Sequence, residues 1–246
     1  MPAERPVALV TGAAKRVGAA IARRLHAAGY DLALHHRHSG QEMAALVAEL
    51  EAARPFSTLV LKAELADAAA LPDLVTATEA HFGRLDALVN NASAFRPTPL
   101  GHATPDDWDE LFASNARAPF FLAQAAAPAL RAAGGAIVNL GDIYGERPLK
   151  DHAIYCMAKA ALLMLTQSLA KDLGPEVRVN AVAPGAVMWP EQGKPEAEKA
   201  AMLARTALQR AGDPADVAEA VRWLLMDARY TTGQVVRVDG GRSLSL

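Results

Sequence analysis

Short apolar runs rich in β-branched residues alternate along the chain with longer amphipathic runs rich in alanine and leucine. The short runs predict strands over residues 7–10, 31–35, 58–62, 87–90, 136–140, 178–182 and 234–238. The longer runs predict helices over residues 15–28, 41–53, 68–82, 105–133, 153–172 and 214–227. Because parallel strands need crossover connections, this alternation predicts an α/β fold: a doubly wound parallel sheet of seven strands with helices on both faces.

One segment, 185–205, departs from this alternation. Pro190, Gly193 and Pro195 punctuate it, and charges are scattered through it. We expect it to be a substrate loop that leaves the carboxyl edge of the sheet, where α/β folds bind ligands. No repeat, linker or break in composition divides the chain, so we expect a single domain over residues 1–246.

Composition narrows the classes of function. Hydrophobic residues make up 52% of the chain, which is ample for a core, and the net charge of −2 makes nucleic acid a poor candidate partner. Charges interrupt the apolar runs, and the N-terminus lacks the apolar stretch of a signal peptide, so we expect no membrane association. The single cysteine cannot form an internal disulfide, and we expect a cytoplasmic protein. The histidines at 35–38 lack the spacing of metal ligands, so no metal is predicted.

A glycine-containing turn follows the first predicted strand. It reads TGAAKRVG from Thr11 to Gly18 and leads directly into the first predicted helix. Glycines at such a turn let the backbone approach a pyrophosphate, and the helix N-terminus supplies free N–H groups and positive potential. The turn therefore predicts a dinucleotide site that includes Gly12, Arg16, Val17 and Gly18.

The end of the second strand indicates which dinucleotide is bound. A site for NAD would place an Asp or Glu there to bond the ribose 2′-hydroxyl. This chain has His35, His36, Arg37, His38 and Ser39 instead. A carboxylate would repel a 2′-phosphate, whereas Arg37, His38 and the Ser39 hydroxyl can donate hydrogen bonds to one. We therefore predict NADPH as the cofactor.

Tyr155 and Lys159 are the main candidates for chemistry. Residues four apart on a helix lie on one face, about one turn apart. An ammonium beside a phenol favours the phenolate, so we expect the pKa of Tyr155 to lie below its usual value of about 10. Such a phenol can donate or accept a proton near neutral pH.

Taken together, these features resemble the short-chain dehydrogenase/reductase family over nearly the whole chain. The matching motifs, in family order, are TGAAKRVG, NNAS at 90–93, Asn115, YxxxK at 155–159, Pro184-Gly185 and VDGG at 238–241. The resemblance implies a single-domain Rossmann fold and a homotetramer. It also implies that Asn115 anchors a proton relay, that Tyr155 is the acid/base group, and that Lys159 holds the nicotinamide ribose. Further cofactor contacts are implied at Glu64, Leu65, Asn91, Ala92, Ser93, Pro184 and Gly185.

Three departures from the general family pattern resemble the pteridine reductase branch. Arg16 replaces a glycine, Asp142 replaces a serine thirteen residues before the tyrosine, and the usual NNAG becomes NNAS followed by Ala94-Phe95. In that branch the residue matching Phe95 stacks on the pterin, and those matching Ser93 and Arg16 contact the ligand. Met188, Trp189 and His152 are expected near the rim of the same site.

The predicted reaction is NADPH-dependent reduction of a pterin. Hydride goes from nicotinamide to C7 of an oxidised pterin, with N8 protonated by Tyr155 coupled to Asp142 and Lys159, or to C6 of a 7,8-dihydropterin, with N5 protonated through water. One alternative is a carbonyl or 3-oxoacyl-thioester reductase of the same family. Another is a non-catalytic module that senses NADP.

Overall fold

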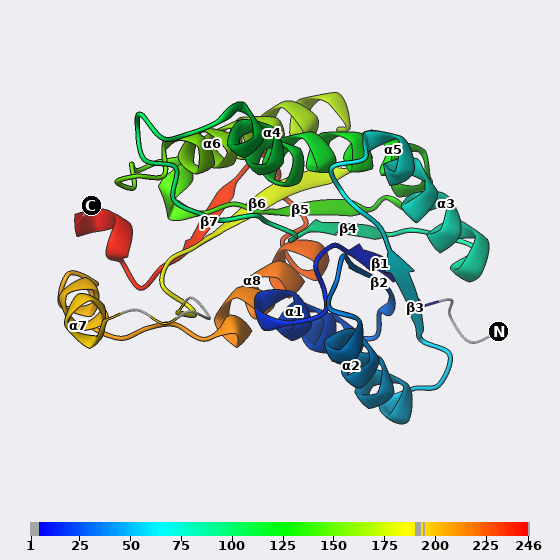
Figure 1. The fold of residues 1–246 in the computed structure, drawn as a ribbon. Coiled ribbons are helices and arrows are strands. Elements are labelled where there is room, and N and C mark those ends of the chain that lie inside the picture. The colour runs from blue at the N-terminus through cyan, green and yellow to red at the C-terminus, as the bar shows by residue number, and fades with distance from the viewer. Residues whose placement is uncertain (1–4, 190–192, 194, 246) are drawn as a thin grey trace.

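The computed structural model describes residues 5–189, 193 and 195–245. At its centre is a seven-stranded sheet in the order β3-β2-β1-β4-β5-β6-β7, with every neighbouring pair parallel (Figure 1). The strands are β1 (Val7–Val10), β2 (Asp31–His36), β3 (Thr58–Lys62), β4 (Ala87–Asn90), β5 (Ala136–Leu140), β6 (Arg178–Pro184) and β7 (Val235–Val238). The predicted α/β fold is confirmed, and each predicted strand lies within two residues of its observed ends.

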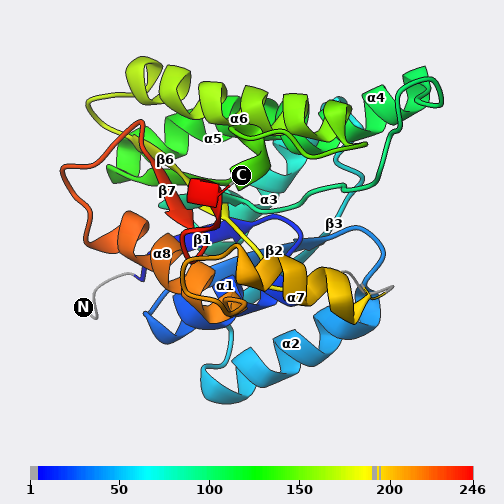
Figure 2. The same ribbon diagram turned by 90° about the vertical axis from the view of Figure 1, so that its left-hand side faces the viewer.

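Helices cover both faces of the sheet (Figures 1 and 2). One layer holds α1 (Arg16–Ala27), α2 (Gly40–Ala53) and α8 (Pro214–Met226), and the other holds α3 (Leu71–Phe82), α4 (Pro105–Phe112), α5 (Ala118–Ala133) and α6 (Ala153–Asp172). Two apolar clusters lie between the sheet and these layers. The strand order reverses between β1 and β4, so the ligand crevice of the fold is expected at their carboxyl ends.

Local sequence explains where several helices begin and end. Thr104 caps α4 through a reciprocal capping box with Asp107, and Asp213 caps α8 in the same way with Asp216. Gly29 has a φ of 99° just after α1, which suits the residue that follows a helix C-cap. These signals can be read in the sequence because the partners lie within one turn.

Two predicted segments were wrong in detail. Residues 105–133 form α4 and α5 separated by a π-helical turn, Ala113–Arg117, where a continuous helix was expected. At this turn Ser114 and Asn115 both donate to backbone carbonyls one turn earlier, and both also bond Ala94 after β4. Segment 185–205 contains a helix, α7 (Glu196–Ala204), beyond the carboxyl edge of the sheet (Figure 1). Pro190 lies outside the described residues.

One helix among the described residues, α6, is long and apolar enough to cross a membrane by length and composition alone. Its sequence nevertheless includes Lys159, so a charge interrupts its apolar run as expected. A core helix passes the same test, so the finding is weak support for a membrane segment. In this fold α6 packs against β6 and buries Leu162 and Leu169.

Candidate active site

A cavity of about 650 Å³ lies where the carboxyl ends of β1, β2, β4 and β5 meet. Its lining brings together most of the predicted cofactor residues: Gly12, Arg16, Val17, Gly18, His36, Arg37, His38, Ser39, Glu64, Leu65, Asn91, Ala92, Ser93, Tyr155, Lys159 and Pro184. Gly185 follows Pro184, and its N–H donates a hydrogen bond to the carbonyl of Val238 in β7. Asp142, Asn115, Phe95 and Trp189 are not part of the lining, but each contacts a residue that is.

The glycine turn is shaped for a close backbone approach. Gly12 has a φ of 62°, and a Cβ added at Gly18 would lie 2.1 Å from the Gly12 carbonyl oxygen. At the start of α1, Lys15 makes no side-chain cap, and the first turn carries no acidic residue. The N-terminus of α1 therefore faces the cavity with the positive potential that suits a pyrophosphate.

Polar side chains hold this turn in place. The Gly12 N–H donates to Nδ1 of His35 at 3.2 Å, so this imidazole nitrogen carries no proton. Burial lowers the pKa of His35, which keeps the ring neutral. Asn91 donates from Nδ2 to the carbonyls of Thr11 and Gly12 at 2.8 and 2.9 Å. Thr11 and His35 were not predicted as site residues, and only their places at strand ends signal the role.

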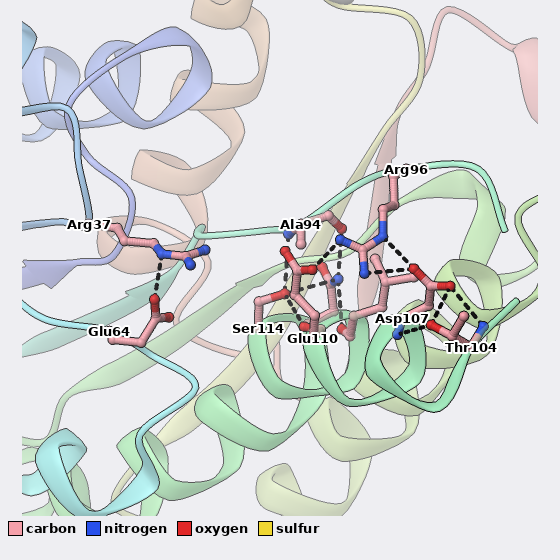
Figure 3. A network of polar contacts seen from close by, with 10 residues as sticks. Arg37, Glu64, Ala94, Arg96, Thr104, Asp107, Glu110 and Ser114 are labelled. Carbon is pink, nitrogen blue, oxygen red and sulfur yellow. Dashed lines mark hydrogen bonds and ion pairs between the residues drawn. The ribbon is translucent and has the colours of Figure 1, made fainter.

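The end of β2 carries the cationic part of the cavity. Arg37 forms an ion pair with Glu64, and both side chains are about half exposed (Figure 3). Nδ1 of the buried His36 has no hydrogen-bond partner among the residues that the structure describes. An unpaired buried nitrogen and an exposed guanidinium in one cavity wall suit an anionic ligand.

Tyr155 and Asp142 are joined directly. The Tyr155 hydroxyl donates to Oδ2 of Asp142 at 2.7 Å, and Oδ1 accepts from the Tyr144 N–H at 2.9 Å. Burial raises the pKa of Asp142, against the effect of these hydrogen bonds and of Lys159. The arrangement is a phenol and a carboxyl group that can pass one proton between them.

The expectation that the pKa of Tyr155 is lowered was wrong. Burial and the negative charge of Asp142 raise the pKa of Tyr155 well above its ordinary value. Lys159 does not offset them, because its ammonium donates to the Leu140 carbonyl at 2.8 Å and lies 5.8 Å from the centre of the phenol ring. Burial lowers the pKa of Lys159 to about 8.

Asn115 lies in the π-helical turn and contacts the segment that follows β4. Its Oδ1 accepts from the Ser93 hydroxyl at 2.7 Å, and its Nδ2 donates to the Ala94 and Leu111 carbonyls, both at 2.9 Å. Asn115 is buried, so these bonds fix the segment that follows β4. The side chain of Ser114 adds a bond to the Ala94 N–H (Figure 3).

Aromatic side chains gather beside the phenol. Phe95 keeps 51% of its surface exposed and meets Tyr155 edge to face at 4.8 Å between ring centres. Arg16 and Trp189, both predicted substrate residues, are in contact. The guanidinium of Arg16 donates a hydrogen bond to the backbone carbonyl of Trp189 at 3.1 Å. The indole ring lies 5.7 Å from the ammonium of Lys199 in α7. The sequence pattern gave no signal for these two contacts.

Comparisons with known proteins agree with this geometry. A family model described as enoyl-(acyl carrier protein) reductase matches residues 12–243. Pteridine reductase 1 of Leishmania tarentolae is 37% identical, covering 98% of this chain and 97% of that protein. A Streptomyces violaceoruber protein bearing the name of a granaticin polyketide synthase ketoacyl reductase is 39% identical, covering 98% and 97%. The 3-oxoacyl-(acyl-carrier-protein) reductase FabG of Staphylococcus aureus is 35% identical, covering 95% and 96%.

All three relatives are named as reductases, and the uncapped helix N-terminus, the glycine turn and the unpaired His36 nitrogen fit a nicotinamide dinucleotide. The chain belongs to the short-chain dehydrogenase/reductase family and is an NAD(P)-dependent oxidoreductase.

Proposed function

We propose that this enzyme reduces pterins with NADPH. The observation that carries the proposal is the 2.7 Å hydrogen bond between Tyr155 and Asp142, with Phe95 against the same phenol. Reducing a C=N bond requires a proton on nitrogen, and a carboxyl group beside the phenol can resupply that proton. The ionised form of this carboxyl group would repel a substrate carbonyl oxygen, and in the structure both of its oxygens are already bonded to Tyr155 and to the Tyr144 N–H, which disfavours a ketone.

NADPH would be held along the whole cavity. The Gly12–Gly18 turn and the start of α1 suit its pyrophosphate, while His36, Arg37, His38 and Ser39 suit the 2′-phosphate. Lys159 lies where it could hold the nicotinamide ribose, as the family resemblance implies. When bound, NADPH supplies the hydride delivered to C7 of an oxidised pterin or to C6 of a 7,8-dihydropterin.

The protein's own residues handle the proton. With Asp142 protonated, its O–H donates to the phenol oxygen, which frees the Tyr155 proton for N8 of an oxidised pterin. As that proton leaves, the one from Asp142 replaces it on Tyr155, and the carboxylate regains a proton from water. For a 7,8-dihydropterin, N5 takes its proton through water. Each turnover thus consumes one hydride and one proton.

Recognition of the ring rests on Phe95, Ser93 and Arg16. A pterin is flat and heteroaromatic, and stacking on an aromatic side chain adds about 0.5–1.5 kcal/mol beyond burial. Ser93 and Arg16 line the cavity and can bond the ring's polar edge. Stacking and edge bonds together would orient the reacting carbon, making hydride transfer effectively intramolecular.

The second candidate is a 3-oxoacyl-thioester reductase. Two of the compared relatives carry names of that chemistry. The Asp142–Tyr155 pair favours pterins over such substrates, because a C=N bond needs a proton on nitrogen and this carboxyl group can resupply it through the phenol.

A spectrophotometric panel decides between them. NADPH oxidation is followed with dihydrobiopterin, dihydromonapterin, dihydrofolate, oxidised biopterin and an acetoacetyl thioester, each at matched concentrations. We expect turnover with at least one pterin and little with the thioester. The reverse pattern would replace the proposal with the second candidate. Binding of NADPH without turnover of any substrate would instead favour the sensing module.

NADH in place of NADPH tests the cofactor assignment, and size-exclusion chromatography with light scattering tests the expected homotetramer. Cytoplasmic location remains a prediction, which fractionation of the source cells would test.

A further inference from the structure

We infer that His152 is a positioning residue for Phe95 and thereby sets how tightly the enzyme holds its flat substrate. This inference rests on the proposed function. The two rings are stacked, with centres 4.7 Å apart and planes at 18°. Phe95 thus contacts His152 along one face and meets Tyr155 edge to face at 85°. The stack fixes the tilt of the Phe95 ring relative to the phenol that delivers the proton.

The backbone around His152 is built to present this ring. The preceding residue, Asp151, has a φ of 60°, a left-handed conformation that costs a non-glycine residue energy. Its carbonyl accepts from the Thr98 N–H at 2.6 Å, which ties the segment before α6 to the loop that carries Phe95. Nδ1 of His152 lies 2.7 Å from the Lys150 carbonyl, so that nitrogen is the donor and the ring is pinned.

The histidine side chain at position 152 does not stabilise the start of α6 by capping it. His152 is the N-cap of α6, and its side chain makes no capping hydrogen bond. Ser, Thr, Asp and Asn are strongly preferred at an N-cap because their oxygens accept from the first turn. A residue that breaks a local rule without local benefit points to a role elsewhere. Here the ring faces Phe95 instead of the helix.

The other side of the Phe95 loop is held by charge. The guanidinium of Arg96 lies between Asp107 and Glu110 of α4, bonding Asp107 from Nε at 2.9 Å and pairing with Glu110 (Figure 3). The loop is therefore anchored to α4 by ions, and to the segment at the start of α6 by the Thr98–Asp151 hydrogen bond and the aromatic stack. Of these contacts, the stack touches the Phe95 ring itself, so it has the more direct control over substrate stacking.

The test is His152→Asn, compared with His152→Phe. Asparagine is a good N-cap, so thermal stability should stay level or rise, while the KM for the pterin rises about threefold to tenfold through loss of the stack. The dissociation constant for NADPH should stay within about twofold of wild type. His152→Phe keeps a flat ring and should restore most of the affinity for the pterin. His102→Asn, in the exposed part of the Phe95 loop, is the matched control.

A double-mutant cycle shows whether His152 acts through Phe95. In a Phe95→Ala background, His152→Asn should leave the KM for the pterin unchanged, because the ring that it positions is gone. Three results would overturn the inference: an unchanged KM in His152→Asn, equal losses in the Asn and Phe variants, or an undiminished effect in the Phe95→Ala background. If wild type turns over no pterin, the proposed function itself fails, and that result is read before any variant is compared.

Discussion

The two ends of the cavity are held by different forces. At the cofactor end, Gly12 and Gly18 are fixed by backbone atoms and by polar side chains such as Asn91. At the substrate end, the half-exposed Phe95 is held by its ring contacts with His152 and Tyr155 and by the ion pairs of its neighbour Arg96. Close backbone packing tolerates little change in volume, whereas stacks and surface ion pairs can be exchanged side chain by side chain. The comparison suggests that cofactor binding is built into the fold and substrate choice into its loops.

The reacting group sits between these ends, so its loss should cost most. Tyr155→Phe removes the proton donor and should lower kcat about 10³-fold, since general acid catalysis contributes on that order. NADPH should still bind, because the phenol oxygen's partner in the structure is Asp142. Stopped-flow rates and a fluorescence titration with NADPH measure the two effects separately. Tyr230→Phe, at a fully exposed tyrosine, serves as the control, and near-normal turnover in Tyr155→Phe would remove the tyrosine from its assigned role.

Gly18→Ala tests whether the cofactor end is as tight as the comparison implies. The added methyl group would lie 2.1 Å from the Gly12 carbonyl and 2.7 Å from Asn91 Nδ2, so the turn must shift. We expect the affinity for NADPH to fall about tenfold to hundredfold, in line with the cost of overpacking. Gly40→Ala offers a matched control, because its Cβ would meet only a ring carbon of His36 at 3.8 Å. Equal, small effects on titration with NADPH would mean that the turn is more adaptable than its packing indicates.

Asp142→Asn separates proton supply from cofactor binding. Burial raises the pKa of Asp142, and the protonated carboxyl is the form that resupplies Tyr155. Turnover of an oxidised pterin should therefore fall as pH rises through that pKa, which lies above the ordinary range of a carboxyl group. The variant should lose about tenfold to hundredfold in kcat and lose this limb of the pH–rate profile. Asp73→Asn, on the exposed surface of α3, is the control. A limb that persists in Asp142→Asn would belong to another group, and an equal loss of NADPH affinity would make Asp142 structural.

Sequence patterns predicted the seven strands and most helices because those depend on periodicity and on caps within one turn. The π-helical turn was missed because its residues Ser114 and Asn115 bond Ala94, a contact between segments distant along the chain that helical periodicity does not report. Helix α7 was missed because proline and glycine before it suggested a loop, although EAEKAAMLA favours a helix.

The shift of the Tyr155 pKa was predicted with the wrong sign for a related reason. The spacing of Tyr155 and Lys159 on one helix is local, and it correctly puts the two side chains on one face. The outcome depends on groups brought in from elsewhere, because Asp142 and the carbonyl that takes up Lys159 both come from the end of β5. The pKa of Tyr155 is therefore determined more by the groups at the end of β5 than by the spacing of Tyr155 and Lys159 on the helix.

The smallest predicted effect is the change in NADPH affinity on replacing Glu64. At this residue the cofactor end of the cavity is held by an exposed ion pair and not by packing. Arg37 is paired with Glu64 in the structure, so a 2′-phosphate must compete with that carboxylate for the guanidinium. Exposed ion pairs contribute about 0–1 kcal/mol, so Glu64→Gln should tighten NADPH binding about twofold to threefold and should do less for NADH. Arg37→Gln should act in the opposite direction and by more, because a charge-assisted bond to phosphate is lost.

The NADPH titration is repeated at low and high salt, since screening weakens exposed charges. The gain in Glu64→Gln should shrink as salt rises, while Glu79→Gln on α3 should show no gain. Weaker NADPH binding in Glu64→Gln would show instead that Glu64 orients Arg37 toward the phosphate. The ion pair would then be part of the fixed geometry of the cofactor site. An exposed ion pair would in that case not distinguish the substrate end of the cavity from the cofactor end.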